Sequence, residues 1–212
     1  ILEFTPGVFD EFDNIKHVER DLKTCSILLF DRGFINEFEL KGLDIAGSAV
    51  AEIEDARLIF AGAPKGKEED IAQSFLRCNL PASRLTVRGL VQERESVKRL
   101  FCEVDLLLMP SRTEGFGLTG LEALSAGVPI LVSKNSGFGE ALSKVPFGAS
   151  CVVDSEDSKV WAEEIEKVWR KERKNRLSEA KGPLTSYDEK YSWSTQCKAL
   201  INKMTHILSG MQ

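Results

Sequence analysis

Short apolar runs alternate with amphipathic stretches along most of the chain, and this alternation limits the folds open to it. The runs are apolar at successive positions, which is typical of strands buried on both faces. Strands of this kind separated by helices indicate a parallel sheet covered on both sides. The sequence therefore predicts a doubly wound α/β domain. The expected strands are 26–30, 57–61, 84–88, 104–109, 129–132 and 149–153, and the expected helices between them are 43–53, 68–76, 93–102 and 120–125.

The chain after the predicted sheet is expected to be helical. An apolar stripe with Trp161, Ile165 and Trp169 predicts an amphipathic helix over 157–173, and a second helix is expected over 193–208. Gly182-Pro183 is expected to break the chain between them. The charged stretch 170–176 is interpreted as a solvated helix end rather than a basic patch.

These boundaries give a single domain with three parts. We expect 1–22 to be a linker that leads into the sheet, 23–155 to be the sheet core, and 156–212 to be C-terminal helices. A length of 212 residues is enough for one such domain. The chain opens with Ile1, and we expect it to be a piece of a longer protein.

Composition and charge exclude several classes of partner and compartment. The net charge of −5 and the absence of basic residues interleaved with aromatics predict no nucleic-acid partner. No apolar stretch reaches the roughly 18–20 residues that span a bilayer. Five scattered cysteines without a C-x-x-C pair favour neither a disulfide framework nor a zinc cluster. A reducing compartment fits this pattern, so we predict a cytoplasmic location.

The segment 110–129 is the most informative for chemistry. It follows a predicted strand, carries Gly115 and Gly117, and runs into a predicted helix. Glycines allow a ligand close to the backbone, and the N–H groups of a first helical turn point outward. Together with the helix dipole, these features predict an anion site at the carboxyl end of the strand.

Two acids bracket this loop, Glu114 before the predicted helix and Glu122 within it. A carboxylate beside an anion site repels phosphate but accepts hydrogen bonds from vicinal hydroxyl groups. A phosphate flanked by two polyols describes a nucleotide sugar. The structural alternative is that Glu114 only complements the helix dipole and that Glu122 is a surface residue.

The string from Glu114 to Pro129 resembles the E-x7-E segment of retaining GT-B glycosyltransferases of the group 1 kind. In that family the segment lies in the C-terminal, donor-binding Rossmann-like domain. Further stretches match the family in order: Thr5-Pro6-Gly7-Val8, Lys41-Gly42-Leu43-Asp44, Phe60-Ala61-Gly62, Val87-Arg88-Gly89, Ser136-Gly137-Phe138-Gly139-Glu140 and Tyr191-Ser192-Trp193.

The resemblance implies a role for each matching residue. Lys41 and Arg32 would contact the donor diphosphate, and Glu114 would hold the donor sugar or stabilise its oxocarbenium-like state. Glu122 would bind the ribose. The remaining donor contacts would come from Gly33, Gly62, Gly89, Leu90, Val91, Gly115, Phe116, Gly117, Leu118 and Thr119. Transfer would proceed with retention and without a metal or other cofactor, the nucleotide diphosphate sugar being the donor substrate.

The resemblance covers only the second of the two Rossmann-like domains of the family. We expect the chain to need an N-terminal, acceptor-binding domain for transfer, and the isolated chain to be inactive. Apolar surface around Ile201 and Ile207 would then lack its cover and favour self-association or a partner. The alternative is a catalytically inactive nucleotide-sugar-binding or interaction module in a larger protein. A nicotinamide-binding domain is disfavoured because no G-x-G-x-x-G follows the first strand.

Overall fold

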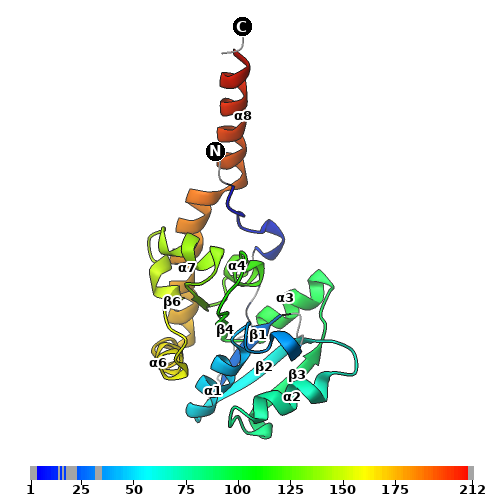
Figure 1. Cartoon of the computed structure of the whole chain (residues 1–212). Helices are drawn as coiled ribbons and strands as arrows, with labels where there is room; N and C mark the ends of the chain where they lie inside the picture. The colour runs from blue at the N-terminus through cyan, green and yellow to red at the C-terminus, as the bar shows by residue number, and fades with distance from the viewer. Residues whose placement is uncertain (1–3, 14, 16, 18–22, 32–34, 210–212) are drawn as a thin grey trace.

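Six parallel strands form one twisted sheet at the centre of the molecule (Figure 1). The computed structural model describes residues 4–13, 15, 17, 23–31 and 35–209. The strand order is β3-β2-β1-β4-β5-β6, so the winding direction reverses between β1 and β4. The strands are β1 (Cys25–Phe30), β2 (Ala56–Ala63), β3 (Leu85–Gly89), β4 (Leu106–Met109), β5 (Ile130–Ser133) and β6 (Val152–Val153).

Successive side chains of the inner strands enter two separate cores. In β1, Ile27 and Leu29 pack on one face, whereas Leu28 packs on the other. The first core is covered by α1 (Leu43–Glu52), α2 (Glu68–Leu76) and α6 (Ser158–Trp169). The second is covered by α3 (Arg94–Cys102), α4 (Leu118–Ser125), α5 (Gly137–Ser143) and α7 (Arg173–Tyr191). The doubly wound α/β prediction is confirmed.

The N-terminal segment is more ordered than a simple linker. A short 3-10 helix, η1 (Asp10–Phe12), places Phe12 in the second core, where its side chain is fully buried. Phe12 makes an edge contact with Phe101 of α3. The remaining 3-10 helices are η2 (Ile35–Glu37), η3 (Ala82–Arg84) and η4 (Gly148–Cys151).

Two boundary predictions near the end of the sheet are wrong. The expected strand 149–153 is mainly η4, and only Val152–Val153 pairs with β5. The expected helix 157–173 ends at Trp169, because α7 begins a new direction at Arg173. Helix α4 starts at Leu118, two residues before the predicted start.

The predicted break at Gly182-Pro183 is also wrong, because α7 continues through Pro183. Pro183 is buried, and four residues later the Tyr187 hydroxyl donates to the Pro6 carbonyl at 2.8 Å. Gly182 lies against the Phe147 ring. The packing of α7 on the domain thus offsets the cost of the hydrogen bond that a proline removes from a helix.

The charged stretch 170–176 is not simply a solvated helix end. Asp105, which precedes β4, is buried and binds the guanidinium groups of both Arg173 and Arg176. Its other oxygen accepts from the Ser26 N–H at 3.0 Å. The Arg176 guanidinium also lies over the Trp169 ring, 4.5 Å from its centroid. This cluster joins α7 to the amino ends of β1 and β4.

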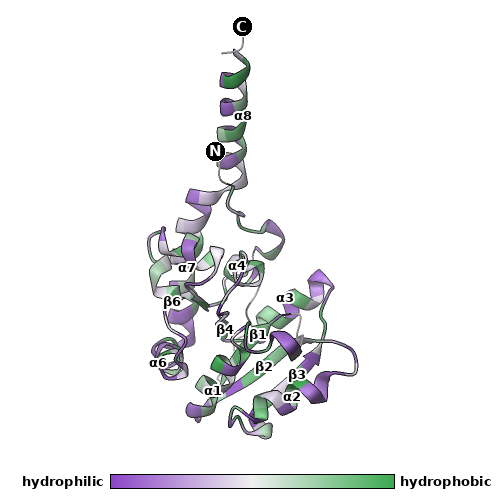
Figure 2. Ribbon diagram, in the orientation of Figure 1, coloured by the Kyte–Doolittle hydropathy of each residue, from purple (hydrophilic) through white to green (hydrophobic). Residues whose placement is uncertain are grey.

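The last helix, α8 (Trp193–Ser209), extends away from the body of the domain (Figure 1). Its large apolar side chains are exposed, and Figure 2 shows apolar and polar residues alternating along it. The exposed apolar residues of α8 are Trp193, Leu200, Ile201, Met204, Ile207 and Leu208. Among the described residues, no helix is both long and apolar enough to cross a bilayer.

Candidate functional site

The loops after β1 and β4 meet where the winding of the sheet reverses. Ligands of open α/β sheets bind beyond the carboxyl ends of the strands at this switch point. The loop after β1 carries Lys41 just before α1, and the loop after β4 carries Glu114 just before α4. The topology therefore brings together two of the residues that the sequence singled out.

Lys41 and Glu114 form a direct ion pair across the switch point. The Lys41 Nζ lies 2.7 Å from Glu114 Oε2 and 3.6 Å from Asp31 Oδ2, at the end of β1. Both side chains of the pair are about one-fifth exposed, at 20% and 22%. Burial alone would lower the pKa of Lys41, but the hydrogen bond to Glu114 and the charge of Asp31 outweigh it and raise that pKa above its ordinary value. Asp31 received no role from the sequence.

The Glu114 loop is fixed by backbone bonds to the loop after β5. The Glu114 N–H donates to the Asn135 carbonyl at 3.1 Å. The Gly115 and Phe116 carbonyls accept from the Gly137 and Phe138 N–H groups at 2.9 and 2.7 Å. Ser136 caps α5 by accepting from the Gly139 N–H. The first turn of α5 thus holds the predicted phosphate loop through these backbone hydrogen bonds.

The N-terminus of α4 is the predicted anion site, and we call its first-turn N–H groups the anion cradle. Gly117 has φ +95°, a conformation that other residues adopt only with strain, and an added Cβ there would also lie 2.5 Å from the end of the Met109 side chain. A Cβ on Gly115 would meet nothing within 4 Å, so this glycine faces open space. Helix geometry leaves the first-turn N–H groups, those of Leu118 and Thr119, without intrahelical acceptors. The Gly115 N–H donates to Glu114 Oε1 at 3.0 Å.

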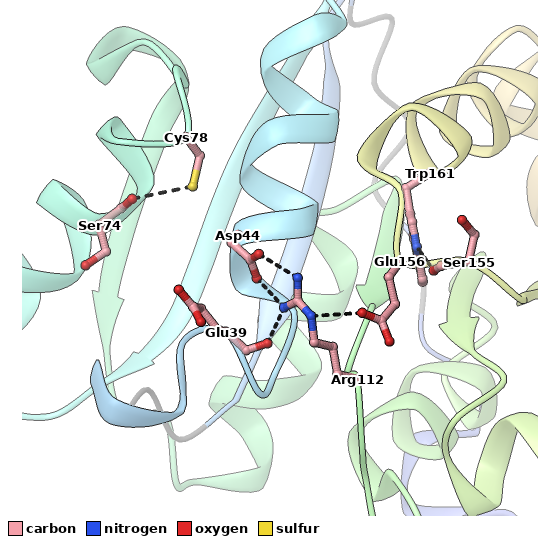
Figure 3. Close-up of polar contacts among 8 residues, drawn as sticks. All are labelled: Glu39, Asp44, Ser74, Cys78, Arg112, Ser155, Glu156 and Trp161. Carbon is pink, nitrogen blue, oxygen red and sulfur yellow. Dashed lines mark hydrogen bonds and ion pairs between the residues drawn. The ribbon is translucent and has the colours of Figure 1, made fainter.

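Arg112 is a site residue that the sequence did not identify. Its guanidinium binds both Asp44 oxygens, at 2.7 and 2.8 Å, and its Nε donates to Glu156 at 3.2 Å (Figure 3). The bond to Asp44 and the charge of Glu156 raise the pKa of Arg112 above its ordinary value. Asp44 lies within the matched motif 41–44, and Arg112 lies in the segment 110–129, two residues before the matched string that begins at Glu114.

Glu122 lies one turn into α4 and binds an arginine rather than standing free. Its Oε1 is 2.9 Å from Arg94, the first residue of α3, and Arg94 also pairs with Glu11 at 3.2 Å. The Glu122 side chain is 17% exposed. Burial raises its pKa, and this effect exceeds the opposing effect of Arg94. A ribose hydroxyl at Glu122 would therefore share it with Arg94.

The other predicted donor contacts fall at the carboxyl ends of β2 and β3. Gly62 sits at a register shift in β2 with φ +132°, and Gly89 ends β3 opposite Ala63. Leu90 is 46% exposed, whereas Val91 packs against the second core just before α3. Arg32 and Gly33 lie outside the described residues. Within the residues that the structure covers, no three His, Cys, Asp or Glu side chains gather into a metal site.

Comparison with known proteins identifies a family. A family model described as "Family 4 Glycosyltransferase in conflict systems" matches residues 1–200. The D-inositol 3-phosphate glycosyltransferase of Mycolicibacterium smegmatis is 28% identical over 212 residues, covering 97% of this chain and 45% of that protein. The chain thus spans about half the length of the curated relatives it matches.

Solved structures share the fold. Sucrose-phosphate synthase from Thermosynechococcus elongatus has a TM-score of 0.68 at 17% identity, over 89% of this chain and 46% of that one. The Anabaena HepE protein, solved in complex with UDP and glucose, has a TM-score of 0.68 at 19% identity, over 87% of this chain and 49% of that one. The domain therefore has the Rossmann-like architecture found in one half of GT-B proteins.

Proposed function

We propose that this chain, which belongs to the family 4 glycosyltransferases of conflict systems, is the donor-binding half of such an enzyme. Its ligand is a nucleoside diphosphate sugar, bound across the carboxyl ends of β1 and β4. The observation that carries the proposal is the Lys41–Glu114 pair beside the N-terminus of α4, at the switch point of the sheet. HepE, whose fold is similar, has been solved in complex with UDP and glucose.

Each group in this arrangement has a distinct part in the proposed transfer. Lys41 and the first-turn N–H groups of α4 meet the negative charge that grows on the leaving diphosphate. Glu114 binds the hydroxyls of the donor sugar and stabilises positive charge on its ring. Arg32 would add a second cation, and Glu122 would bind the ribose. Because the protein supplies this charge itself, we propose transfer without a metal. Retention is proposed from the family resemblance alone.

The proposed enzyme needs an N-terminal, acceptor-binding domain. The chain spans 45% of the mycobacterial relative, which leaves room for a second domain. The start of the described chain lies beside α8, because Gln196 bonds to both the N–H and the carbonyl of Thr5. Phe4 is exposed, and so are the large apolar side chains of α8. A preceding domain would join the chain next to this apolar surface and cover it.

A second candidate is an inactive nucleotide-sugar-binding module within a larger protein. Cleavage of a nucleotide sugar by the full-length protein would exclude this candidate. Binding of the sugar nucleotide without any cleavage would support it over an active enzyme.

Thermal melting with UDP, GDP, ADP and their sugar conjugates tests the donor site. A ligand at a hundred times its Kd adds about 2.7 kcal/mol, which raises the melting temperature of a domain of this size by roughly 5–10 °C. We expect one diphosphate to give such a shift. Lys41→Ala should reduce the shift for the diphosphate but not for the matching nucleoside. Lys134→Ala, whose exposed side chain pairs with Asp154, is the control. No shift with any diphosphate would contradict the proposal.

A further inference from the structure

The segment from Pro110 to Arg112 contacts the turn that carries Lys41. These contacts lie both before and after Lys41 in the sequence. On one side, the Arg112 backbone N–H donates to the Leu40 carbonyl at 3.0 Å, and its guanidinium donates to the Glu39 carbonyl. On the other side, Arg112 binds the Asp44 carboxylate with two parallel bonds (Figure 3). The two loops of the candidate site are thus joined through one arginine.

Gly42 makes this junction closer. It has φ +63°, and an added Cβ would lie 2.0 Å from the Pro110 carbonyl oxygen. The backbone next to Lys41 therefore rests directly on the end of β4. A side chain at this position would separate the two loops, which leaves the approach to glycine.

A guanidinium suits this place because its bonds have fixed directions. One planar group satisfies a carboxylate, a backbone carbonyl and, through Nε, the Glu156 carboxylate at 3.2 Å. A lysine ammonium carries the same charge but cannot match a carboxylate with a rigid fork. Arg112 reaches neither the anion cradle nor Lys41 by any of these bonds, and it is two residues from Glu114.

We infer that Arg112 is a positioning residue, which sets Lys41 against Glu114 by holding the turn at Glu39, Leu40 and Asp44. The part of this inference that concerns donor binding rests on the proposed function. The part that concerns the Lys41–Glu114 pair does not, and it can be tested without a ligand.

The sign of the change at Lys41 distinguishes positioning from a charge effect. If Arg112 acted only through its charge, Arg112→Gln would remove a nearby cation and raise the pKa of Lys41. If Arg112 positions the turn, the substitution loosens the pair with Glu114, and the pKa of Lys41 falls toward its ordinary value. Arg112→Lys keeps the charge but loses the rigid fork, so positioning lowers the pKa of Lys41 here too, whereas a pure charge effect leaves it unchanged.

The titration can be followed by NMR of the 212-residue chain after reductive methylation of its lysines with 13C-formaldehyde. The signal of Lys41 is assigned by its loss in Lys41→Arg. Arg170→Lys is the matched control, because Arg170 pairs with Glu166 on the exposed surface of α6. An unchanged or raised pKa of Lys41 in either Arg112 variant would overturn the inference.

Ligand binding provides a second, separable readout. We expect the Arg112 variants to weaken whichever of UDP, GDP and ADP the chain binds by about tenfold, as for the loss of a charged hydrogen bond, and to leave the nucleoside unaffected. If the unaltered chain binds none of them, the proposed function fails, and the Lys41 titration still decides the role of Arg112. Equal weakening of nucleoside and diphosphate would overturn positioning of the diphosphate contact.

Discussion

Each end of the sheet carries a carboxylate bound by cationic side chains, but the two are built differently. At the amino end, Asp105 is 4% exposed and binds two arginines and the Ser26 N–H. At the carboxyl end, Glu114 is 22% exposed and binds one lysine and the N–H of the next residue. The first carboxylate lies inside the packed body, whereas the second lies at the edge of open space beside Gly115.

This difference in burial separates charges that hold the fold together from charges that a ligand can reach. The partners of Asp105 come from β1 and α7, so its bonds join elements far apart in the sequence. Removing one member of such a buried cluster leaves the others without compensation. Glu114 and Lys41, in contrast, are partly exposed, and in the proposed site a ligand replaces their contact with little loss of packing. The following changes test this contrast, from the largest expected effect to the smallest.

Asp105→Ala should strongly destabilise the fold. It leaves Arg173 and Arg176 without their buried carboxylate, which costs about 3–5 kcal/mol. For a domain of this size, the melting temperature should fall by roughly 6–20 °C. The control is Asp154→Ala, which removes an exposed carboxylate paired with Lys134 and should cost below about 1 kcal/mol. Equal effects of the two substitutions would erase the distinction between the two ends of the sheet.

Glu114→Gln should leave stability nearly unchanged but strengthen the binding of two ligands to different extents. Loss of the carboxylate frees Lys41 for a diphosphate, so the Kd of the cognate nucleoside diphosphate should fall by about fivefold. The sugar conjugate should gain less, because its hydroxyls lose their charged acceptor. Titration calorimetry with both ligands measures the two values. A parallel gain for both ligands would show that Glu114 does not contact the sugar.

Glu140→Gln is the matched control for this experiment. Glu140 is an exposed acid in the first turn of α5, which Ser136 caps. Its removal changes the net charge of the chain by the same amount without touching Lys41. A gain in diphosphate affinity as large as that of Glu114→Gln would assign the effect to long-range charge rather than to the ion pair.

Much of the fold follows from sequence pattern, because buried parallel strands leave long apolar runs. The strands from β1 to β5 and the helices from α1 to α4 match their predicted positions within two residues. The errors fall where tertiary contacts decide. Pro183 stays within α7 because it is packed on the domain, and Arg176 is buried because Asp105 lies beneath it. Neither partner is near in sequence, so no local pattern could reveal the contact.

The site is predicted only in part, because some of its residues act through contacts between loops that are far apart in the sequence. Glu114 is predicted from its place after a strand and from its motif, whereas Lys41 is predicted from its motif alone. The strand order brings the two together. Asp31, Arg94 and Arg112 were missed because their roles depend on which loops are neighbours in space. Arg112 and Asp44 are 68 residues apart, so only the β1–β4 pairing makes them partners.

The smallest expected effect concerns Glu122, whose side chain is 17% exposed and so lies between Asp105 and Glu114 in burial. Burial raises the pKa of Glu122, so the fold disfavours its ionised form. The protonated side chain carries no such penalty, and the stability of the fold therefore decreases as the pH rises through the pKa that Glu122 has in the folded protein. Glu122→Gln cannot ionise, and Arg94 keeps its other partner, Glu11. The variant should therefore melt slightly higher at pH 7, by no more than about 2 °C, and this gain should vanish below about pH 4. Glu11→Gln removes the more exposed partner of the same arginine and should show no such gain. A lower melting temperature for Glu122→Gln at pH 7 would mean that the pair with Arg94 outweighs burial and that Glu122 belongs with Asp105 among the structural charges.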